Sequence, residues 1–294
     1  MAAFGFSLSL AHRGARPAAR PVLDAFAGTL YAAYGLTRLL TAQTGPGVRV
    51  RRSSDGAEAD IGFTPLGALD SAALLAFAGT ASAYAVIWYD QSGNGRHATQ
   101  SVTAAQPRLV NAGALDTGPN GRPVLAFSGS QNFGIAGAAD FARKADNVTI
   151  GVAGLSSATA GSAAFFSASK GANLSWYRAG ILHTPTLAAA RFAASANDLD
   201  NPPLASRGYV MGSWARFIGR ARFLEDGLDF AIDGATTMVA LGTSTASVDS
   251  DSTVRIGVSP NGGAPLYGQM SALVLARAPL AIAALDAALQ GTLP

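Results

Sequence analysis

The sequence predicts a mostly β protein, built as a β-sandwich or jelly roll with short helices near its two ends. After residue 84, short apolar runs recur about every ten to fifteen residues between clusters of Gly, Asn, Asp and Ser, a pattern that indicates many short strands joined by tight turns. The chain has 294 residues, and at about this length a protein buries roughly 75% of the surface that its unfolded chain exposes. A full apolar core is therefore expected.

The N-terminal region is expected to begin with an arm. Residues 1–24 combine short apolar alternation with an Arg/Pro/Ala stretch, and they have no core of their own. We expect this arm to dock on another subunit or partner. Apolar residues then follow at helical spacing and predict a helix over residues 23–40, which Gly45-Pro46-Gly47 would end.

A small hairpin and two helices complete the expected elements outside the sandwich. The turn residues Ser53-Ser54-Asp55-Gly56 join two predicted strands, 48–52 and 59–63. Asp70 is positioned to cap a helix over residues 72–77, since its carboxylate can accept from free backbone N–H groups. The Ala/Leu-rich segment 280–289 follows a proline and predicts a terminal helix.

Three regions result from this assignment. They are an N-terminal arm (residues 1–24), a helix and hairpin extension packed on the sandwich (residues 25–83), and the sandwich itself (residues 84–294).

Composition excludes several classes of function. The chain has no cysteine, which rules out a disulfide scaffold, a thiolate metal site and a cysteine nucleophile. The net charge is only +3, and the arginines form no dense basic stripe, so we expect no nucleic-acid partner. In the strand 48–52, arginines alternate with valines, which favours a solvated or subunit-contacting face over an anionic-ligand patch. The longest charge-free stretch, 71–89, contains Gly, Thr and Ser breaks, and we expect no membrane insertion.

A metal site has one weak candidate. Asp90-x-Ser92-x-Asn94 has the spacing of the first half of a calcium loop, but position twelve is Ser101 and a single carboxylate supplies little charge. The alternative is an Asx-type turn in which Asp90 and Asn94 bond the local backbone. The three histidines show no metal-ligand spacing. We expect neither a metal nor a cofactor.

One string is specific enough to suggest a family. The segment WYDQSGNGRHATQ, residues 88–100, resembles the first strand and turn of concanavalin A-like, laminin-G-type jelly rolls. With AAYGLTRL at 32–39 and the segments 48–55 and 60–63, it resembles the α-L-arabinofuranosidase B catalytic family, which uses this fold. The later string GRPVLAFSG at 121–129 resembles the strand that leads into a laminin-G-type sandwich. The resemblance covers about residues 27–290. It implies a concanavalin A-like jelly-roll β-sandwich with a small N-terminal helix/hairpin extension and a C-terminal helix.

The family resemblance also implies where catalytic carboxyls should stand. It places a nucleophilic glutamate in the middle of the sandwich and an acidic aspartate in a Gly-rich loop before a late strand. The corresponding segments here, residues 163–170 and 256–263, contain no carboxylate, and the family's vicinal cysteines are missing. Retaining glycoside hydrolysis needs two carboxyls about 5 Å apart. We therefore expect no enzymatic activity, with a hydrolase that has relocated carboxylates as the alternative.

Modules of this kind also resemble surface proteins of tailed-phage and gene-transfer-agent particles. That resemblance implies a non-catalytic glycan-binding or adhesion protein, a head spike or tail fibre, made in the bacterial cytoplasm and carried on the particle surface. Its expected partners are host cell-surface polysaccharide, other particle structural proteins through the N-terminal arm, and further copies of itself. A purely structural decoration protein is a second alternative.

A sugar-binding site needs aromatic platforms beside polar side chains. Tyrosine offers a flat face with few rotors, and arginine offers a planar fork for hydroxyl or acidic groups. Both segments that mix these residue types correspond to the active-site face of the resembled family. The candidate carbohydrate-binding residues are Tyr177, Arg178, Asn261 and Tyr267, whereas the neighbouring Trp176 is expected in the core.

Overall fold

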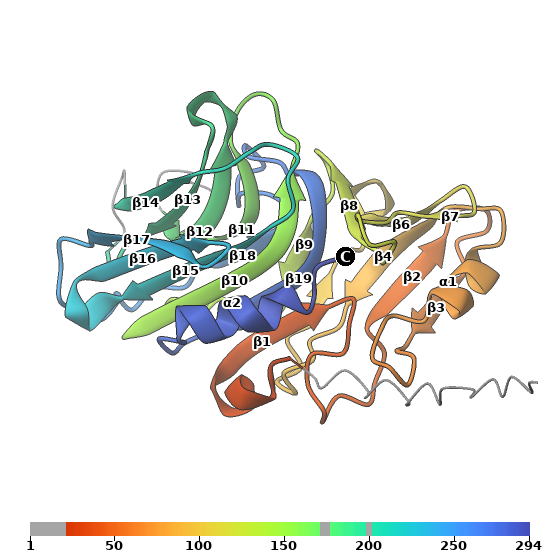
Figure 1. Cartoon of the computed structure of the whole chain (residues 1–294), viewed down its shortest axis with the longest axis horizontal. Coiled ribbons are helices and arrows are strands. Elements are labelled where there is room, and N and C mark those ends of the chain that lie inside the picture. The colour runs from red at the N-terminus through yellow and green to blue at the C-terminus, as the bar shows by residue number, and fades with distance from the viewer. Residues whose placement is uncertain (1–21, 171–176, 198–201) are drawn as a thin grey trace, which may run out of the picture.

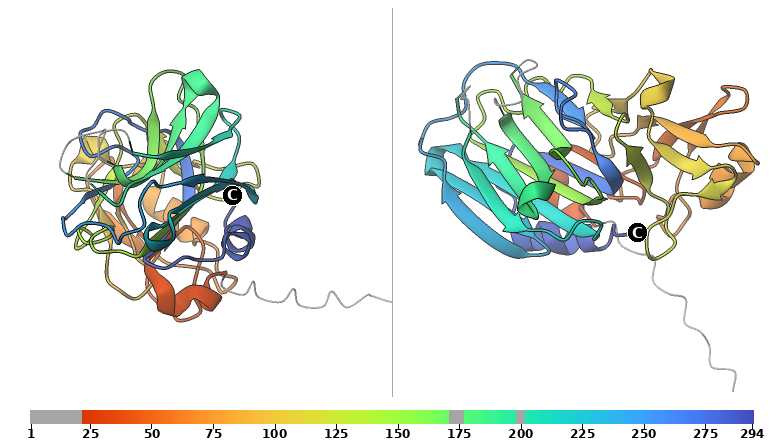
Figure 2. Two further views of the ribbon diagram at one scale, coloured as in Figure 1. Left: turned by 90° about the vertical axis from the view of Figure 1, so that its left-hand side faces the viewer. Right: turned by 90° about the horizontal axis from the view of Figure 1, so that it is seen from above.

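The computed structural model describes residues 22–170, 177–197 and 202–294. Nearly all of the predicted arm, residues 1–21, lies outside this range. In the described part, 19 strands are linked by hydrogen bonds into one nearly closed sheet. The protein is thus mostly β, with a sandwich-like architecture in which the sheet folds over on itself (Figures 1 and 2).

The first layer contains the long central strands. Its hydrogen-bonded order is β17 (Ala235–Ala240), β16 (Gly227–Ile232), β15 (Ala215–Arg222), β10 (Asn147–Ser156) and β19 (Tyr267–Ala276). Strand β19 then pairs with β1 (Leu30–Gly35) along one part of its length and with β8 (Leu125–Ser128) along another. From β8 the layer continues through β6 (Arg108–Asn111), β4 (Ala83–Trp88), β2 (Val48–Arg52) and β3 (Glu58–Ile61).

The second layer covers the first. Its order is β14 (Leu204–Gly208), β13 (Ala189–Ala194), β12 (Tyr177–Thr184), β11 (Ala163–Ser169), β18 (Thr253–Ile256), β9 (Phe133–Ile135) and β5 (Ala98–Thr99). Strand β5 pairs with β4, so both layers meet at β4. A two-stranded hairpin joins β6 to β7 (Ala114–Leu115).

The main core lies between the two layers. Large aromatic side chains fill it, and each of the following is 0% exposed: Trp88, Phe133, Phe165, Phe166, Phe192, Phe217 and Phe230. A second apolar cluster lies under helix α2 (Ile282–Gln290), on the outer face of β10, β15 and β19. Gly151 permits this close approach, because a Cβ there would lie 3.0 Å from a methyl of Leu289. The helix therefore stabilises the outside of the first layer.

Several sequence predictions are confirmed. The hairpin forms between β2 and β3, and Asp70 caps α1 (Ser71–Ala78) by accepting from the N–H of Ala73 at 3.0 Å. The terminal helix is α2. The alternation in β2 also holds, since Val48 and Val50 are fully buried while Arg49 and Arg51 are half-buried.

The predicted helix over residues 23–40 was wrong. A short 3₁₀ helix, Asp24–Thr29, is followed by strand β1. Every residue of β1 is buried, because one face contacts the main core and the other contacts the cluster under α2. A strand buried on both faces shows a continuous apolar run without alternation, and such a run cannot be told from a helix by its period.

The boundary expected between residues 83 and 84 stays a prediction. Strand β4 begins at Ala83 and pairs with β2, so one sheet runs from the N-terminal hairpin into the sandwich. The segment around β2, β4 and β6 therefore shares its hydrogen bonds with the sandwich strands (Figure 1).

Candidate functional site

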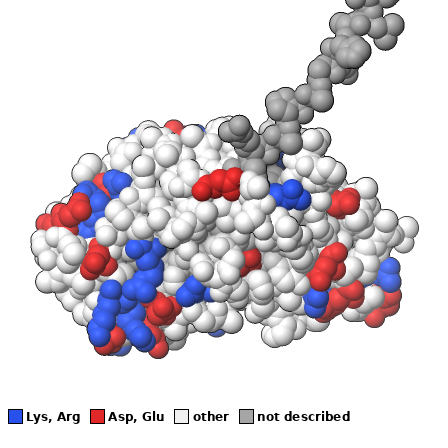
Figure 3. Space-filling view, turned by 90° about the horizontal axis from the view of Figure 1, so that it is seen from below, with Lys and Arg blue, Asp and Glu red and all other residues white. Residues whose placement is uncertain are grey.

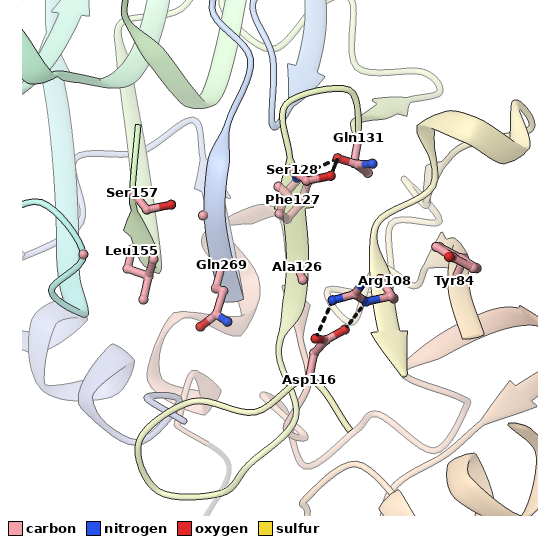
Figure 4. Close-up of a pocket in the computed structure, with 12 residues that line it drawn as sticks. Tyr84, Arg108, Asp116, Ala126, Phe127, Ser128, Gln131, Leu155, Ser157 and Gln269 are labelled. Carbon is pink, nitrogen blue, oxygen red and sulfur yellow. Dashed lines mark hydrogen bonds and ion pairs between the residues drawn. The ribbon is translucent and has the colours of Figure 1, made fainter. Parts of the chain in front are cut away.

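A row of half-buried side chains crosses the outer surface of the first layer. Strand pairing places them in the order Leu155 (β10), Gln269 (β19), Ala126 (β8), Arg108 (β6) and Tyr84 (β4). Directly opposed residues on neighbouring strands lie on the same face of a sheet. The residues on either side of Ala126 point the other way and are buried in the core. The row therefore faces solvent (Figure 4).

A cleft of about 540 Å³ lies over this row. We call it the central cleft, and its remaining lining residues are Asp116, Phe127, Ser128, Gln131, Ser157, Gly212 and Gly268. Its size falls within the range of about 300–1,000 Å³ that is typical of small-molecule sites. Serine hydroxyls and glutamine amides are spread along its wall, so the cleft can both donate and accept hydrogen bonds.

The chemical centre of the central cleft is an ion pair between Arg108 and Asp116. The guanidinium donates from Nε to Oδ2 at 2.7 Å and from Nη2 to Oδ1 at 3.0 Å. This two-bond geometry is the strong form of an arginine–carboxylate contact. The bond to Asp116 raises the pKa of Arg108 above its ordinary value. The side chain of Asp116 is 15% exposed, so the carboxylate remains accessible from the cleft.

The local sequence explains how this pair is positioned. In the turn between β6 and β7, Ala112 and Gly113 have φ angles of +46° and +83°. A two-residue turn with both φ positive joins antiparallel strands tightly, and it brings the chain straight back along β6. The N–H of Asp116 then donates to the carbonyl of Leu109 at 2.9 Å. Asp116 is thereby held beside Arg108.

Tyr267 lies at the edge of the central cleft. It is 46% exposed and pairs across the strands with Ser128, which lines the cleft. Its ring occupies the space next to Gly129, where a Cβ would lie 2.3 Å from a ring carbon. Gly129 also has a φ of +99°, so a side chain at this position would be strained as well as crowded.

The other predicted carbohydrate-binding residues lie elsewhere. Asn261 is exposed, and its Oδ1 accepts from the hydroxyl of Ser259 and the N–H of Gly263 in a tight turn. Arg178 is fully buried and donates to the hydroxyl of Ser250 at 2.7 Å and to two backbone carbonyls.

The side chain of Tyr177 and all of Trp176 lie outside the described residues. The structure thus brings Tyr267 to the central cleft and places Arg178 inside the protein. Carbohydrate binding by the four residues stays a prediction.

Sequence reasoning missed the residues that line the central cleft. Arg108 and Asp116 are separated by a short turn with Gly113, and this spacing could have suggested a cross-hairpin ion pair. Nothing local links them to Gln131 or Gln269. Those residues meet only because strands from distant parts of the chain are neighbours in the sheet.

The carboxylate of Asp90 accepts four hydrogen bonds from the protein. Oδ1 accepts from the N–H groups of Ala33 and Ser92, and Oδ2 accepts from the Ser92 hydroxyl and the N–H of Arg96, all at 2.9–3.0 Å. This arrangement is the Asx-type turn that the sequence offered as the alternative to a calcium loop. Among the described residues no group of three or more His, Cys, Asp or Glu could hold a metal ion.

Charged side chains are sparse and mostly paired. Figure 3 shows basic and acidic groups in small mixed clusters separated by wide uncharged surface. Arg49, for example, bonds both oxygens of Asp60 at 2.8 Å. Within the described segments, no helix has the length and apolar character needed to cross a membrane.

Comparison with solved structures places the fold among arabinofuranosidases. An arabinofuranosidase complexed with arabinofuranosyl-α-1,2-xylobiose superposes with a TM-score of 0.64 at 14% sequence identity. A GH54 α-L-arabinofuranosidase soaked with a cyclic sulfate inhibitor gives a TM-score of 0.59 at 15% identity. Each alignment covers 92% of this chain and 64% of the other chain, so this chain spans about two thirds of the length of those structures. No curated protein matches the sequence.

A family model resolves the relationship more directly. The model of the α-L-arabinofuranosidase B catalytic domain matches residues 23–173. The expectation of a non-catalytic spike or fibre on a phage-like particle was therefore wrong. That expectation gave most weight to the missing carboxylates of two short segments, 163–170 and 256–263, and the first of these lies inside the matched range. The match covers half of the sequence, and the chain belongs to the α-L-arabinofuranosidase B catalytic family.

Proposed function

We propose that the protein is a glycoside hydrolase of the arabinofuranosidase type, acting on α-L-arabinofuranosyl groups of a carbohydrate. The observation that carries this proposal is the family match over residues 23–173. The similarity in fold to arabinofuranosidases supports it. We further propose that the sandwich is a concanavalin A-like jelly roll, since two antiparallel layers enclose a single main core.

The central cleft is the site we assign to the sugar. Hydroxyl groups of a furanose need donors and acceptors in fixed positions, and Ser128, Gln131 and Gln269 supply both. The exposed ring of Tyr267 at the edge of the cleft offers an apolar face for the C–H side of a sugar or its aglycone. A cleft of about 540 Å³ accommodates a ligand of this size.

Asp116 is the carboxylate to which we assign the chemistry. It is the sole carboxylate among the described residues that line the cleft. Glycoside hydrolysis passes through a transition state with positive charge on the sugar ring, and a nearby carboxylate stabilises that charge or attacks the anomeric carbon. Arg108 fixes the orientation of Asp116 through two hydrogen bonds, one to each carboxylate oxygen.

A single carboxylate in the lining of the central cleft has a consequence for substrate preference. Hydrolysis breaks the bond from the anomeric carbon to the leaving oxygen. A water hydroxyl adds to the carbon, and the water proton ends on the leaving group. If Asp116 acts on the sugar ring, the described lining has no second carboxyl group to donate the proton that a poor leaving group needs. General acid catalysis is worth about 10²–10⁴-fold, so we expect 4-nitrophenyl α-L-arabinofuranoside to be cleaved at least about 100-fold faster than the methyl glycoside.

The experiment compares wild-type protein with two variants on the 4-nitrophenyl substrate. Asp116→Asn keeps the side-chain volume but removes the negative charge, and we expect kcat to fall at least about 100-fold. Asp60→Asn is the matched control, because it removes one partner of another two-bond arginine pair, on the solvated face of β2 and β3. It should leave kcat within about twofold of wild type, as expected of an exposed pair away from the cleft.

Two outcomes would contradict different parts of the proposal. If wild-type protein releases no 4-nitrophenol from the arabinofuranoside, the proposed function is wrong. If wild-type protein is active and Asp116→Asn is equally active, the function stands and the assignment of Asp116 is wrong.

A further inference from the structure

A second cavity lies beside the central cleft and has a different character. It has a volume of about 570 Å³ and is lined by Thr159, His183, Pro185, Tyr209, Val210 and Met211, together with Ala188 and Gly208. We call it the His183 cavity. None of these lining residues carries a carboxylate, ammonium or guanidinium group. Val210 and Met211 are 74% and 48% exposed, so apolar side chains form its open side.

His183 is the one strongly polar ring in this cavity, and it is fully buried. Its Nδ1 lies 2.9 Å from the hydroxyl oxygen of Ser156. Its Nε2, on the other edge of the ring, has no hydrogen-bond partner among the described residues. Buried polar atoms in folded proteins are nearly always hydrogen-bonded. His183 lines the cavity, and its Nε2 is buried as well as unpartnered. A ligand in the cavity that displaces the side chains covering this nitrogen would complete its hydrogen bonding.

The charge state of His183 is set by its surroundings. Burial lowers its pKa below the ordinary value of 6.5, and the groups that face the ring are Ser156 and Tyr209, neither of which is charged at neutral pH. The imidazole is thus neutral. A neutral imidazole bonded at Nδ1 offers a single donor or acceptor at Nε2, depending on its tautomer.

The remaining lining favours an aromatic ligand. The ring of Tyr209 packs edge-on against His183, with centroids 5.0 Å apart, and aromatic rings prefer such edge contacts or offset stacking. Met211 lines the cavity and is 48% exposed, and methionine sulfur makes favourable contacts with aromatic rings. Apolar walls with one convergent polar group are the usual composition of a small-molecule site.

We propose that the His183 cavity binds a small, uncharged aromatic molecule that carries a hydroxyl group, with that hydroxyl bonded to Nε2 of His183. This site is separate from the Arg108–Asp116 pair and does not depend on the proposed hydrolase activity. The two cavities adjoin, because Ser157 and Gly212 line the central cleft while Thr159 and Met211 line the His183 cavity. A ligand here would lie one loop away from the sugar site.

Methionine-methyl NMR on the full-length protein tests the proposal with phenol as the probe. The sequence has only four methionines, and three of them report on different places. Met211 lines the cavity, Met238 is 65% exposed on β17, and Met270 is fully buried in the core. Labelled methyl signals are assigned by single Met→Leu variants. We expect phenol to shift the Met211 signal in a saturable way while the Met238 signal stays in place.

Matched ligands and variants isolate the hydrogen bond and the location. Benzene lacks the hydroxyl and benzoate adds a negative charge, so we expect each to bind at least about tenfold more weakly than phenol. His183→Phe keeps a ring but removes Nε2, and should lower phenol affinity to that of benzene. Val210→Asp should weaken phenol binding at least about tenfold, whereas Met238→Asp, at an exposed apolar position on β17, should not.

The Met270 signal shows whether each variant retains its folded core. Should His183→Phe lose this signal, the comparison of phenol with benzene on wild-type protein decides the role of the hydroxyl. Absence of a saturable Met211 shift would overturn the proposal, as would equal affinity for phenol and benzene. Both results are independent of whether the protein hydrolyses arabinofuranosides.

Discussion

The central cleft and the His183 cavity use polar groups in opposite ways. In the cleft, the side chains of Arg108 and Asp116 are 35% and 15% exposed and bond to each other. Around the His183 cavity, His183 is fully buried and Tyr209 is 6% exposed, and both bond to Ser156 in the protein interior. Removing an exposed ion pair changes stability little, whereas removing one partner of a buried hydrogen bond is costly. The cleft can therefore vary its chemistry without loss of the fold.

Replacing Tyr209 by Phe should give the largest change in stability. The Tyr209 hydroxyl accepts from the N–H of Ser156 at 2.9 Å and donates to the carbonyl of Ser213 at 2.7 Å. Tyr209→Phe leaves the buried N–H without its acceptor, at a cost of about 1–3 kcal/mol. Urea unfolding measures this difference. A loss below about 0.5 kcal/mol would show that the buried bonds around the cavity are no more important than those of the cleft.

The pH dependence of His183 should give an intermediate effect. Its pKa in the folded protein lies below 6.5, so on acidification the unfolded chain binds a proton at this residue before the folded protein does. The free energy of unfolding is therefore unaffected by His183 well above pH 6.5. It falls as the pH decreases from about 6.5 toward the lowered pKa, with a limiting slope of about 1.4 kcal/mol per pH unit.

Unfolding curves between pH 8 and pH 5 check this prediction. The difference between wild type and His183→Gln removes the contributions of all other groups. That difference should be constant above pH 7 and should shrink in magnitude below pH 6.5, because only the wild type loses stability through this residue. A difference that stays constant down to pH 5 would contradict the neutral, buried state of His183.

Breaking the ion pair of the cleft should give the smallest change in stability. Arg108→Gln removes the two bonds to Asp116, and we expect a loss of about 1 kcal/mol or less, as for other partly exposed pairs. Activity should respond more strongly, since the orientation of Asp116 is no longer fixed. We expect kcat on the aryl arabinofuranoside to fall about tenfold or more. Equal losses in stability from Arg108→Gln and Tyr209→Phe would remove the contrast between the two sites.

The sequence determined those features that depend on neighbours along the chain. The cap at Asp70, the hairpin between β2 and β3, the alternation of Val48 and Val50 with arginine, and the terminal helix α2 are all local. Each of these features depends on hydrogen bonds, or on an apolar periodicity, between residues that lie within about ten positions of one another. The family resemblance was also visible in short strings such as residues 88–100.

Only the tertiary structure decided β1 and the two cavities. Residues 30–35 are a strand because β19 and the clusters on both faces take up their apolar side chains. The floor of the central cleft joins Leu155, Gln269 and Arg108 from three strands that are distant in sequence. His183 on β12 meets Ser156 on β10, 27 residues apart, because the two layers pack against each other. Sheet pairing and layer packing set these contacts. The period of a single strand shows which face a residue takes, but not which strand lies beside it or opposite it.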